Sequence, residues 1–231
     1  MNNHVFRRKS IGVAIVQFLG IGAVIYAMFG MSGCGLGPGV RGSGVAKTET
    51  REVDAFTRVE GAGSADIAIE TGARQSVVVE TDDNILPLID TTVKGDKLVI
   101  TSHGTYSTRL GVKITIVVPV LDEARISGSG NITASGVSGK GFAAHISGSG
   151  NIRVSGSTDS LTASIAGSGS IDASKLPAGA ADVQVTGSGN IKVVATQSLH
   201  AEITGSGDVR YGGNPARIQK RVTGSGNVRT M

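Results

Sequence analysis

From residue 124 onward, apolar and polar positions alternate in a pattern that returns at short, regular intervals. An alternation with a period of two predicts β-strands that each bury one face. Two aliphatic columns stand on either side of a glycine-rich turn, so each repeat supplies two strands. The column before the turn is Ile126, Ile146, Ile165, Val185, Ile203 and Val222, and the column after it is Ile132, Ile152, Ile171, Ile191, Val209 and Val228.

The turn between the columns reads Gly-Ser-Gly, then Asn, Ser or Asp, then Ile or Val. A period so short and regular indicates one supersecondary unit that is stacked on itself. Glycine fits the corner because it tolerates positive φ and close backbone approach. We therefore predict an all-β fold, a parallel β-helix or solenoid with coils of roughly 19 residues. The copies start 18 to 20 residues apart, at Gly128, Gly148, Gly167, Gly187, Gly205 and Gly224.

The polar residue that follows each Gly-Ser-Gly falls at the same corner of every coil. Asparagine adopts left-handed turns readily and can hydrogen-bond to its neighbours along a stack. We interpret this column as structural rather than catalytic. It contains Asn131, Asn151, Ser170, Asn190, Asp208 and Asn227.

Residues 53–123 are also rich in strand patterns but lack the regular repeat. Residues 59–67 look like a degenerate first copy with two extra residues, and Gly95-Asp96 marks a turn. We expect this half to form irregular coils that close one end of the stack, ahead of the regular repeats in residues 124–231. The predicted strands are residues 53–60, 67–71, 76–81, 91–93, 97–102 and 112–120.

The start of the chain has the pattern of an export signal. Arg7-Arg8-Lys9 precedes an apolar run over residues 11–29, which ends in Met31-Ser32-Gly33-Cys34. This ending resembles the lipobox of bacterial lipoproteins, in which the cysteine is acylated and becomes the mature N-terminus. We predict a signal peptide over residues 1–33 and a lipid on Cys34. That residue is the one cysteine of the chain, so it cannot form an intramolecular disulfide.

An uncleaved transmembrane anchor is the alternative, because the apolar run of about 19 residues is long enough to cross a bilayer. The rest of the chain is exported in either case. Residues 35–52 lack apolar periodicity, so we expect residues 34–52 to hold the lipid attachment and a flexible tether. Gly35 rather than Asp follows Cys34. By resemblance to Gram-negative sorting, this favours the outer membrane or cell surface over the inner membrane.

Composition narrows the function classes. The formal charge of the 231-residue chain is +4, but without Arg7, Arg8 and Lys9 it has 19 basic residues against 18 acidic ones. This near-neutral balance removes the main electrostatic argument for nucleic-acid binding. The 35 glycines do not recur at every third position, which excludes collagen. The 39% of hydrophobic residues alternate with polar ones, which argues against disorder.

Three segments together resemble the bacterial head GIN domain family, whose members are described as putative auto-transporter adhesin heads. They are Ala-Phe-Thr-Arg-Val at residues 55–59, Lys-Gly-Asp-Lys-Leu-Val-Ile at residues 94–100, and the repeated Ser-Gly-Ser-Gly-Asn-Ile. The resemblance covers residues 53–231. It implies a right-handed parallel β-helix-like fold on exported, often lipid-anchored proteins. It brings no catalytic residues with it.

The outward positions give little support to enzyme chemistry. A β-helix that cleaves polysaccharides needs paired carboxylates or a carboxylate-bound metal, and calcium-binding turns need Asp at a fixed position. Only Asp208 occupies the corner, and His103, His145 and His200 do not cluster at ligand spacing. We predict no enzyme activity, no metal and no cofactor. The outward column with one carboxylate reads Thr133, Arg153, Asp172, Lys192, Arg210 and Arg229.

Two outward columns remain as candidates for binding. The plain interpretation is a soluble β surface. The sharper hypothesis is that the basic residues Arg153, Lys192, Arg210 and Arg229 contact acidic glycans or lipid head groups. The second column is rich in hydroxyl groups and consists of Ser127, Ser147, Ala166, Thr186, Thr204 and Thr223.

The last coil presents an exposed sheet edge, which invites pairing with another chain. Arg217, Lys220 and Arg221 would protect this edge by their charge, and end-to-end self-association is the alternative. The predicted function is a non-enzymatic interaction or adhesin-like module of the bacterial cell envelope, with a membrane, a surface glycan or a protein as partner. A structural or stress-related envelope protein without a dedicated ligand is the second reading, and a carbohydrate-active enzyme is the third.

Overall fold

The protein is a β-solenoid of about five turns with 72% strand and almost no helix, which confirms the predicted all-β fold. The structure is a computed structural model and describes residues 39–231. The predicted signal peptide, Cys34 and the first residues of the predicted tether lie outside the described residues. Among residues 39–231, no helix has the length and apolar character that a membrane span requires.

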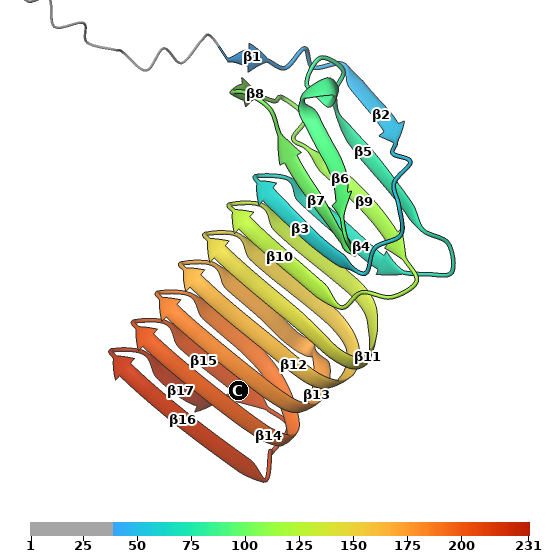
Figure 1. The fold of residues 1–231 in the computed structure, drawn as a ribbon. Helices are drawn as coiled ribbons and strands as arrows, with labels where there is room; N and C mark the ends of the chain where they lie inside the picture. The colour runs from blue at the N-terminus through green and yellow to red at the C-terminus, as the bar shows by residue number, and fades with distance from the viewer. Residues whose placement is uncertain (1–38) are drawn as a thin grey trace, which may run out of the picture. The chain divides into compact units, whose positions relative to one another are not determined.

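Four long strands each run through one complete coil and are folded over at its middle (Figure 1). Neighbouring strands pair in parallel, and the register shifts at the fold, for example between Ala134 and Val137. These bulges divide each coil into the two strands that the sequence predicts. The four strands are β11 (Asn131–Gly148), β12 (Asn151–Gly167), β13 (Ser170–Gly187) and β14 (Asn190–Gly205).

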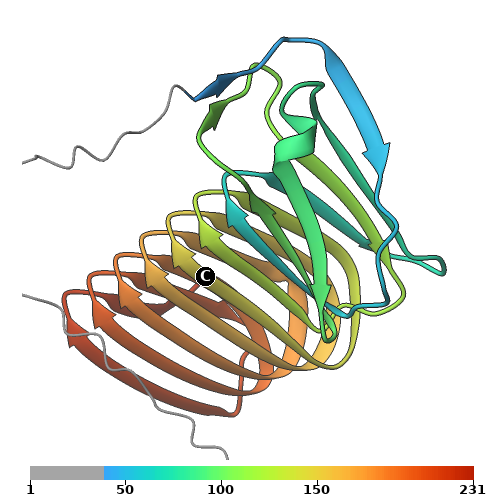
Figure 2. The same ribbon diagram turned by 45° about the horizontal axis from the view of Figure 1, so that its top comes forward.

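The folded strands create two layers that face each other (Figure 2). Layer I contains the second halves of β11 to β14, and layer II contains their first halves. Layer I also includes β6 (Ile89–Lys94), β7 (Lys97–Ser102), β3 (Arg58–Gly63), β10 (Glu123–Gly128) and β16 (Arg217–Gly224). Layer II also includes β2 (Ala46–Thr50), β5 (Ser76–Asp82), β9 (Lys113–Val118), β4 (Asp66–Thr71), β15 (Asp208–Gly212) and β17 (Asn227–Thr230).

The core lies between the two layers and consists of the aliphatic columns. Ile126 pairs in register with Ile146, which pairs with Ile165, and each is at most 2% exposed. Ile132 and Ile152 form the facing column and are at most 1% exposed. The parallel backbone hydrogen bonds hold each coil about 4.8 Å from the next, so equivalent side chains stack on one another and bury their apolar surface. The inward assignment of both columns is confirmed for the coils before the last one.

The Gly-Ser-Gly corners are tight because each coil rests directly on the one before. Gly167 has a φ of +132°, and a Cβ added there would lie 2.3 Å from the carbonyl oxygen of Gly148. That same oxygen accepts a hydrogen bond of 3.0 Å from the backbone N–H of Ser168. Backbone stacking therefore requires glycine at this corner, and no side chain fits.

The segment from β3 to β4 is the first copy of the repeat. Gly63 pairs with Gly128, Asp66 with Asn131 and Ile67 with Ile132, so no residue is inserted between them. The expectation of a degenerate copy is confirmed, whereas the two extra residues are wrong. The correct alignment places Gly61 opposite Ile126, and the side chain of Ile67 occupies the space that a Cβ at Gly61 would need.

The N-terminal end of the stack is closed, as the sequence predicts. The short 3₁₀-helix η1 (Leu86–Leu88) leads from β5 in layer II to β6 in layer I. Ile85 and Leu86 are at most 1% exposed there. The strands β6, β5 and β2 pair antiparallel with their neighbours, which ends the parallel stack.

The structure corrects the flexible tether that we expected up to residue 52. Residues 46–50 form β2 and pair antiparallel with β5, and β1 (Val40–Arg41) pairs in parallel with β8 (Tyr106–Ser107). The polar composition is misleading here because β2 is an edge strand with mostly exposed side chains. Its backbone hydrogen bonds do not depend on apolar periodicity.

Candidate functional site

The basic column forms a continuous row on the outer face of layer II. The parallel register places its members side by side on successive coils, about 4.8 Å apart. Their side chains point outward because, in every coil before the last, the residues that flank them in the strand are buried. In order along the stack the row reads Thr133, Arg153, Asp172, Lys192, Arg210 and Arg229.

Two carboxylates neutralise part of this row. Asp172 Oδ2 lies 3.9 Å from Lys192 Nζ, and Asp208 Oδ2 lies 3.2 Å from the Arg229 guanidinium. Burial opposes ionisation of Asp172, but hydrogen bonds from the Ser174 hydroxyl and backbone N–H, together with nearby cations, lower its pKa overall. Asp172 is therefore a fixed anion within the row.

The other two cations of the row are free to meet a ligand. Within the part of the chain that the structure describes, Arg153 and Arg210 form no salt bridge, and both side chains are exposed. They stand on either side of the pair formed by Asp172 and Lys192. The row therefore combines four cations with one anion, Asp172, and keeps a positive excess even when the neighbouring Asp208 of the corner column is counted.

Shallow hollows follow the same row. The hollow that spans Arg153, Asp172, Lys192 and Arg210 has a volume of about 400 Å³. A second one of about 300 Å³ surrounds Thr133 and Arg153. A third of about 590 Å³ extends over Arg210 and Arg229 to the last coil. This arrangement suits an elongated ligand that lies along the solenoid rather than a compact one in a deep pocket.

The corner column lies beside the basic row and connects the coils. Asn151 Nδ2 donates a hydrogen bond of 2.9 Å to Asn131 Oδ1, and Asn131 Nδ2 donates one of 2.7 Å to Asp66 Oδ1. Asp208 accepts a hydrogen bond of 3.2 Å from the backbone N–H of Asn227. These contacts connect successive coils through the side chains of the corner column. Register places Ser170 and Asn190 in the same column.

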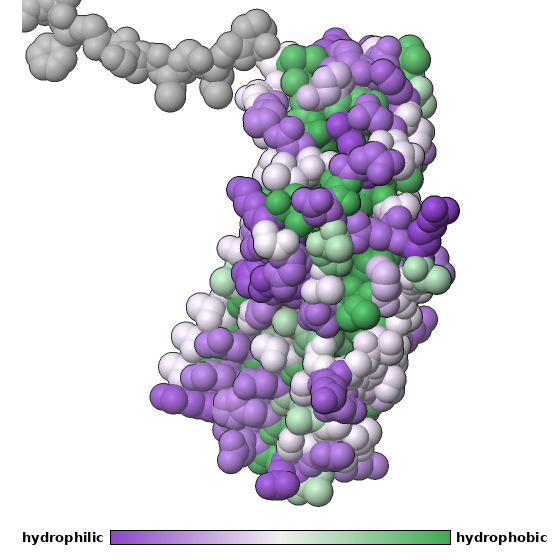
Figure 3. Space-filling model, turned by 45° about the vertical axis from the view of Figure 1, so that its right-hand side comes forward, coloured by the Kyte–Doolittle hydropathy of each residue, from purple (hydrophilic) through white to green (hydrophobic). Residues whose placement is uncertain are grey.

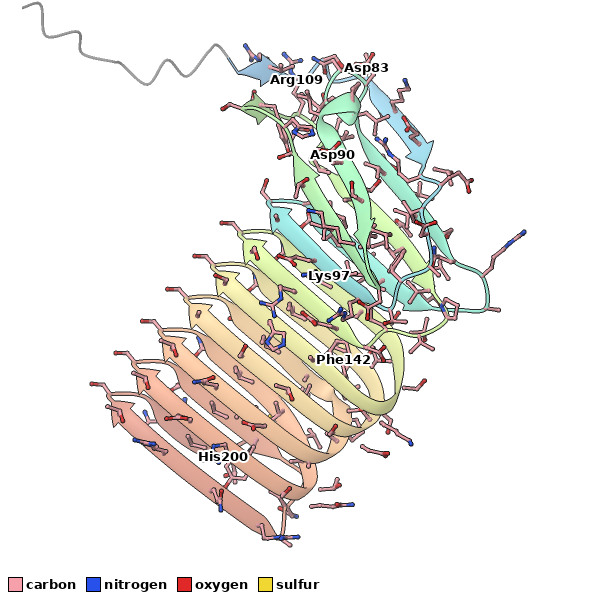
Figure 4. All side chains as sticks on the ribbon, in the orientation of Figure 1. Asp83, Asp90, Lys97, Arg109, Phe142 and His200 are labelled. Carbon is pink, nitrogen blue, oxygen red and sulfur yellow. The ribbon has the colours of Figure 1, made fainter. Side chains whose placement is uncertain are left out.

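The outer face of layer I carries charges that the sequence analysis did not single out. Lys97 Nζ donates a hydrogen bond of 2.5 Å to Glu60, which lowers the pKa of that carboxyl group, and Ser127 donates another of 3.2 Å. Lys97 and His200 both belong to this face (Figure 4). The partners lie on strands distant in sequence, so only the register of β3, β7 and β10 reveals them.

The hydroxyl-rich column also lies on layer I and is in register from coil to coil. It runs along the edge next to the Gly-Ser-Gly corners. The hydroxyl-rich column consists of Ser127, Ser147, Ala166, Thr186, Thr204 and Thr223.

On the face that Figure 3 shows, hydrophobic residues form small groups between hydrophilic ones.

The histidines play separate roles. His145 Nδ1 lies 2.6 Å from the Ser164 hydroxyl oxygen, and burial together with the charge of Arg125 lowers its pKa. His103 Nε2 contacts the Asp90 carboxylate at the N-terminal end. Within residues 39–231, no group of three or more His, Cys, Asp or Glu side chains is arranged to hold a metal ion.

A buried carboxylate that the sequence analysis missed organises the N-terminal end. Asp82 is 0% exposed and accepts hydrogen bonds from the Thr108 hydroxyl at 2.5 Å, from Gly44 N–H at 2.6 Å and from Arg109 N–H at 3.1 Å. These bonds, led by that from Thr108, lower its pKa to about 2. The one sequence feature that points to Asp82 is its position directly after the predicted strand over residues 76–81. Both carboxylate oxygens are occupied by donors from the chain, so the group is structural.

The chain belongs to the family described as "Putative auto-transporter adhesin, head GIN domain", whose model matches residues 55–215. This match establishes the family that the repeated corners and the 94–100 segment indicated. No curated protein matches the chain.

Solved structures share the fold. A putative adhesin from Bacteroides fragilis is 21% identical, with a TM-score of 0.69 over 84% of this chain and 100% of that one. A putative adhesin from Parabacteroides distasonis is 22% identical, with a TM-score of 0.62 and the same two shares. A putative lipid binding protein from the same species is 25% identical, with a TM-score of 0.54 over 84% of this chain and 100% of that one.

Proposed function

We propose that this protein is an exported, lipid-anchored interaction module of the bacterial envelope that binds acidic surface polymers through the outer face of layer II. The observation that carries the proposal is the in-register row of cations along several coils. The adhesin descriptions of the family and of similar structures support an interaction role at the cell surface. The module acts by binding rather than by catalysis, because the row carries the single carboxylate of Asp172 and not the pair that cleavage of a glycosidic bond uses.

The ligand class follows from the geometry of the row. The coil spacing of about 4.8 Å is close to the length of one sugar residue in an extended chain. A linear glycan with acidic groups can therefore lie along the solenoid axis and present one unit to each coil. Arg153 and Arg210 are the unpaired cations in this row, and arginine binds carboxylate and sulfate groups through paired N–H donors.

Anionic lipid is the second candidate ligand. It is favoured by the likeness to a structure described as a putative lipid binding protein. The space between the layers is filled by side chains such as Ile152 and Ile171, which are at most 1% exposed. A lipid would therefore bind through its head group on the outer face.

The binding test uses charge reversal with a control of equal size. The test variant changes all four cations of the row to Glu, and the control changes four exposed basic residues elsewhere to Glu. Binding to immobilised acidic polysaccharides and to vesicles of anionic lipid should be lost in the test variant alone. If both variants bind equally well, the alternative function is favoured, namely a structural envelope protein without a dedicated ligand. The test set is Arg153, Lys192, Arg210 and Arg229, and the control set is Arg74, Lys94, Arg109 and Lys140.

The membrane attachment has its own test. We expect a radiolabelled or clickable fatty acid to be incorporated into the full chain in bacterial cells and the product to fractionate with membranes. Cys34→Ala should lose the label. If Cys34→Ala stays in the membrane fraction without label, the uncleaved apolar run over residues 11–29 is the anchor instead.

A further inference from the structure

The closed end of the solenoid carries a platform of three segments that bond to one another. The backbone N–H of Val40 donates a hydrogen bond of 2.9 Å to the Thr105 carbonyl oxygen. Asn84 accepts one of 2.9 Å from the Ser43 N–H and donates one of 2.8 Å to the Arg41 carbonyl oxygen. Together with the bonds to the buried Asp82 carboxylate, these contacts fix the shape of the platform. It comprises residues 40–45, 82–84 and 105–110, at the end of the solenoid away from β16 and β17 (Figure 1).

Apolar side chains project from the platform into solvent. Val45 is 59% exposed, Val40 is 40% exposed and Leu110 is 39% exposed. Tyr106 lies beside Val40 in register and is half-buried. The backbone groups that bond across the platform already have partners, so this part of the chain can meet an apolar medium without leaving them unpaired. Tyrosine is common where such a medium meets water.

Basic side chains flank the apolar ones. Arg41 and Arg109 are exposed, and neither forms a salt bridge with another residue in the range 39–231. Arg109 lies against Gly44, where an added Cβ would be 3.4 Å from Arg109 Cδ. The partly exposed carboxylate of Asp83 accepts a hydrogen bond of 2.5 Å from the Ser43 hydroxyl. Figure 4 shows Arg109 and Asp83 at this end. The platform thus combines apolar groups with unpaired guanidinium groups, a composition that suits the head-group region of a bilayer.

The platform also begins close to the predicted lipid. Gly39 is the first residue that the structure describes, and it follows Cys34 by five positions. An extended chain covers at most about 3.6 Å per residue, so Gly39 is no more than about 18 Å from the lipidated cysteine. A tether that continued to residue 52 would have allowed about 65 Å. The short connection keeps the closed end near the membrane surface.

We propose that the platform rests on the surface of the membrane that holds the anchor. Val40, Val45 and Leu110 enter the head-group region. Arg41 and Arg109 bind the phosphates of the lipids. This inference rests on the membrane anchor of the proposed function and adds a direction to it. The open end of the solenoid points away from the bilayer, so the basic row on layer II stays available to a ligand.

Tryptophan fluorescence tests the contact, because the chain has no native tryptophan. Full-length protein is reconstituted through its own anchor into vesicles of phosphatidylethanolamine and phosphatidylglycerol with brominated acyl chains, which quench only nearby indole groups. Leu110→Trp places the probe on the platform. Val222→Trp is the matched control, because Val222 is 42% exposed at the other end of the solenoid. The emission of Leu110→Trp should shift to shorter wavelength and lose intensity, and that of Val222→Trp should do neither.

Charge reversal distinguishes a contact with lipid phosphates from mere tethering. Arg41→Glu with Arg109→Glu, added to Leu110→Trp, should reduce the quenching. The control pair Lys140→Glu with Arg217→Glu changes the net charge equally, on exposed positions away from the platform, and should not reduce it. Circular dichroism verifies that each variant is folded. If the reversed pair unfolds, Arg41→Ser with Arg109→Ser replaces it and should reduce the quenching as well.

The outcomes separate this inference from the anchor itself. Folded protein that carries a fatty acid on Cys34 but shows no quenching of Leu110→Trp overturns the platform contact alone. Equal quenching of Leu110→Trp and Val222→Trp also overturns it, since the solenoid would then lie along the membrane. Quenching of Leu110→Trp without a fatty acid on Cys34 supports the contact and makes the apolar run over residues 11–29 the anchor.

Discussion

Thr108 donates a hydrogen bond of 2.5 Å from its hydroxyl to the Asp82 carboxylate and thereby joins the loop after β8 to the end of β5. The same carboxylate accepts the N–H of Gly44, which precedes β2. Asp82 thus fastens three segments that are far apart in sequence at the closed end of the solenoid. Only the ionised carboxylate can accept all of these bonds at once.

Acid should therefore weaken the closed end. The pKa of Asp82 is about 2 in the folded chain, against about 3.9 for an unperturbed aspartate. Because the folded pKa is the lower one, its contribution to stability is complete above about pH 4 and is lost as the pH falls towards 2. We expect urea unfolding midpoints to fall over this range in wild type. The fall should be smaller in Asp82→Asn, which is less stable at neutral pH.

The control for this prediction is Asp159→Asn, which removes an exposed carboxylate from a coil. It should keep the full acid dependence of the wild type. If Asp82→Asn and wild type lose stability in parallel between pH 4 and 2, other carboxylates govern the acid response.

The glycines allow backbone strain and steric clash to be measured separately. Gly139 has a φ of +139° with open space at its Cβ position, whereas Gly169 has no positive φ but would place a Cβ 2.3 Å from the Gly150 carbonyl oxygen. Gly167 combines both features. We expect Gly139→Ala to cost about 1–2 kcal/mol from strain and Gly169→Ala about 1–3 kcal/mol from overpacking. Gly167→Ala should cost the most in urea unfolding.

This ordering would fail if Gly139→Ala were as damaging as Gly167→Ala. The positive φ alone would then explain the need for glycine, and the close stacking of corners would be incidental. A Gly169→Ala variant that is as stable as wild type would likewise show that the close stacking of corners is incidental.

His145 should titrate below the ordinary histidine pKa because it is partly buried and lies near Arg125. A lowered folded pKa means that stability falls as the pH drops below the unperturbed value of about 6.5. Arg125→Ala removes the nearby positive charge and should raise the pKa of His145 in an NMR titration. Lys47→Ala, on β2 in layer II, should leave it unchanged. An Arg125→Ala titration curve identical to wild type would assign the whole shift to burial.

Binding of an acidic polysaccharide should weaken as salt rises, because the contacts are between exposed charges. The slope of log affinity against log salt reports how many cations are engaged. Arg210→Ser should reduce this slope by about 1, and Lys140→Ser should not change it. Affinity that does not respond to salt in wild type would argue against the basic row as the contact surface.

The sequence predicts the coils well because their requirements are local. The alternation around Ile146 and Ile152 and the glycine at each corner are sufficient to define two layers, an apolar core and outward columns. The membership of Arg153 and Lys192 in one row follows from the same register. What a local pattern could not show is pairing across long distances in the chain.

Three features depend on such distant partners. The strand β2 has little apolar character and exists because β5 offers it an edge. The role of Asp82 depends on loops more than 25 residues away in sequence. The sequence marks Lys220 as basic and near the edge, but its inward contact with Tyr211 appears only when the coils are stacked.

The in-register pairing of corner glycines on successive coils also means that the solenoid can change its length by whole coils. Gly148 and Gly167 occupy equivalent places, so removing residues 149–167 would rejoin the chain as Gly148-Ser168 with its corner intact. The closed end and the last coil would each keep their own neighbours. The solenoid can therefore be shortened or extended by whole coils without a change to either end.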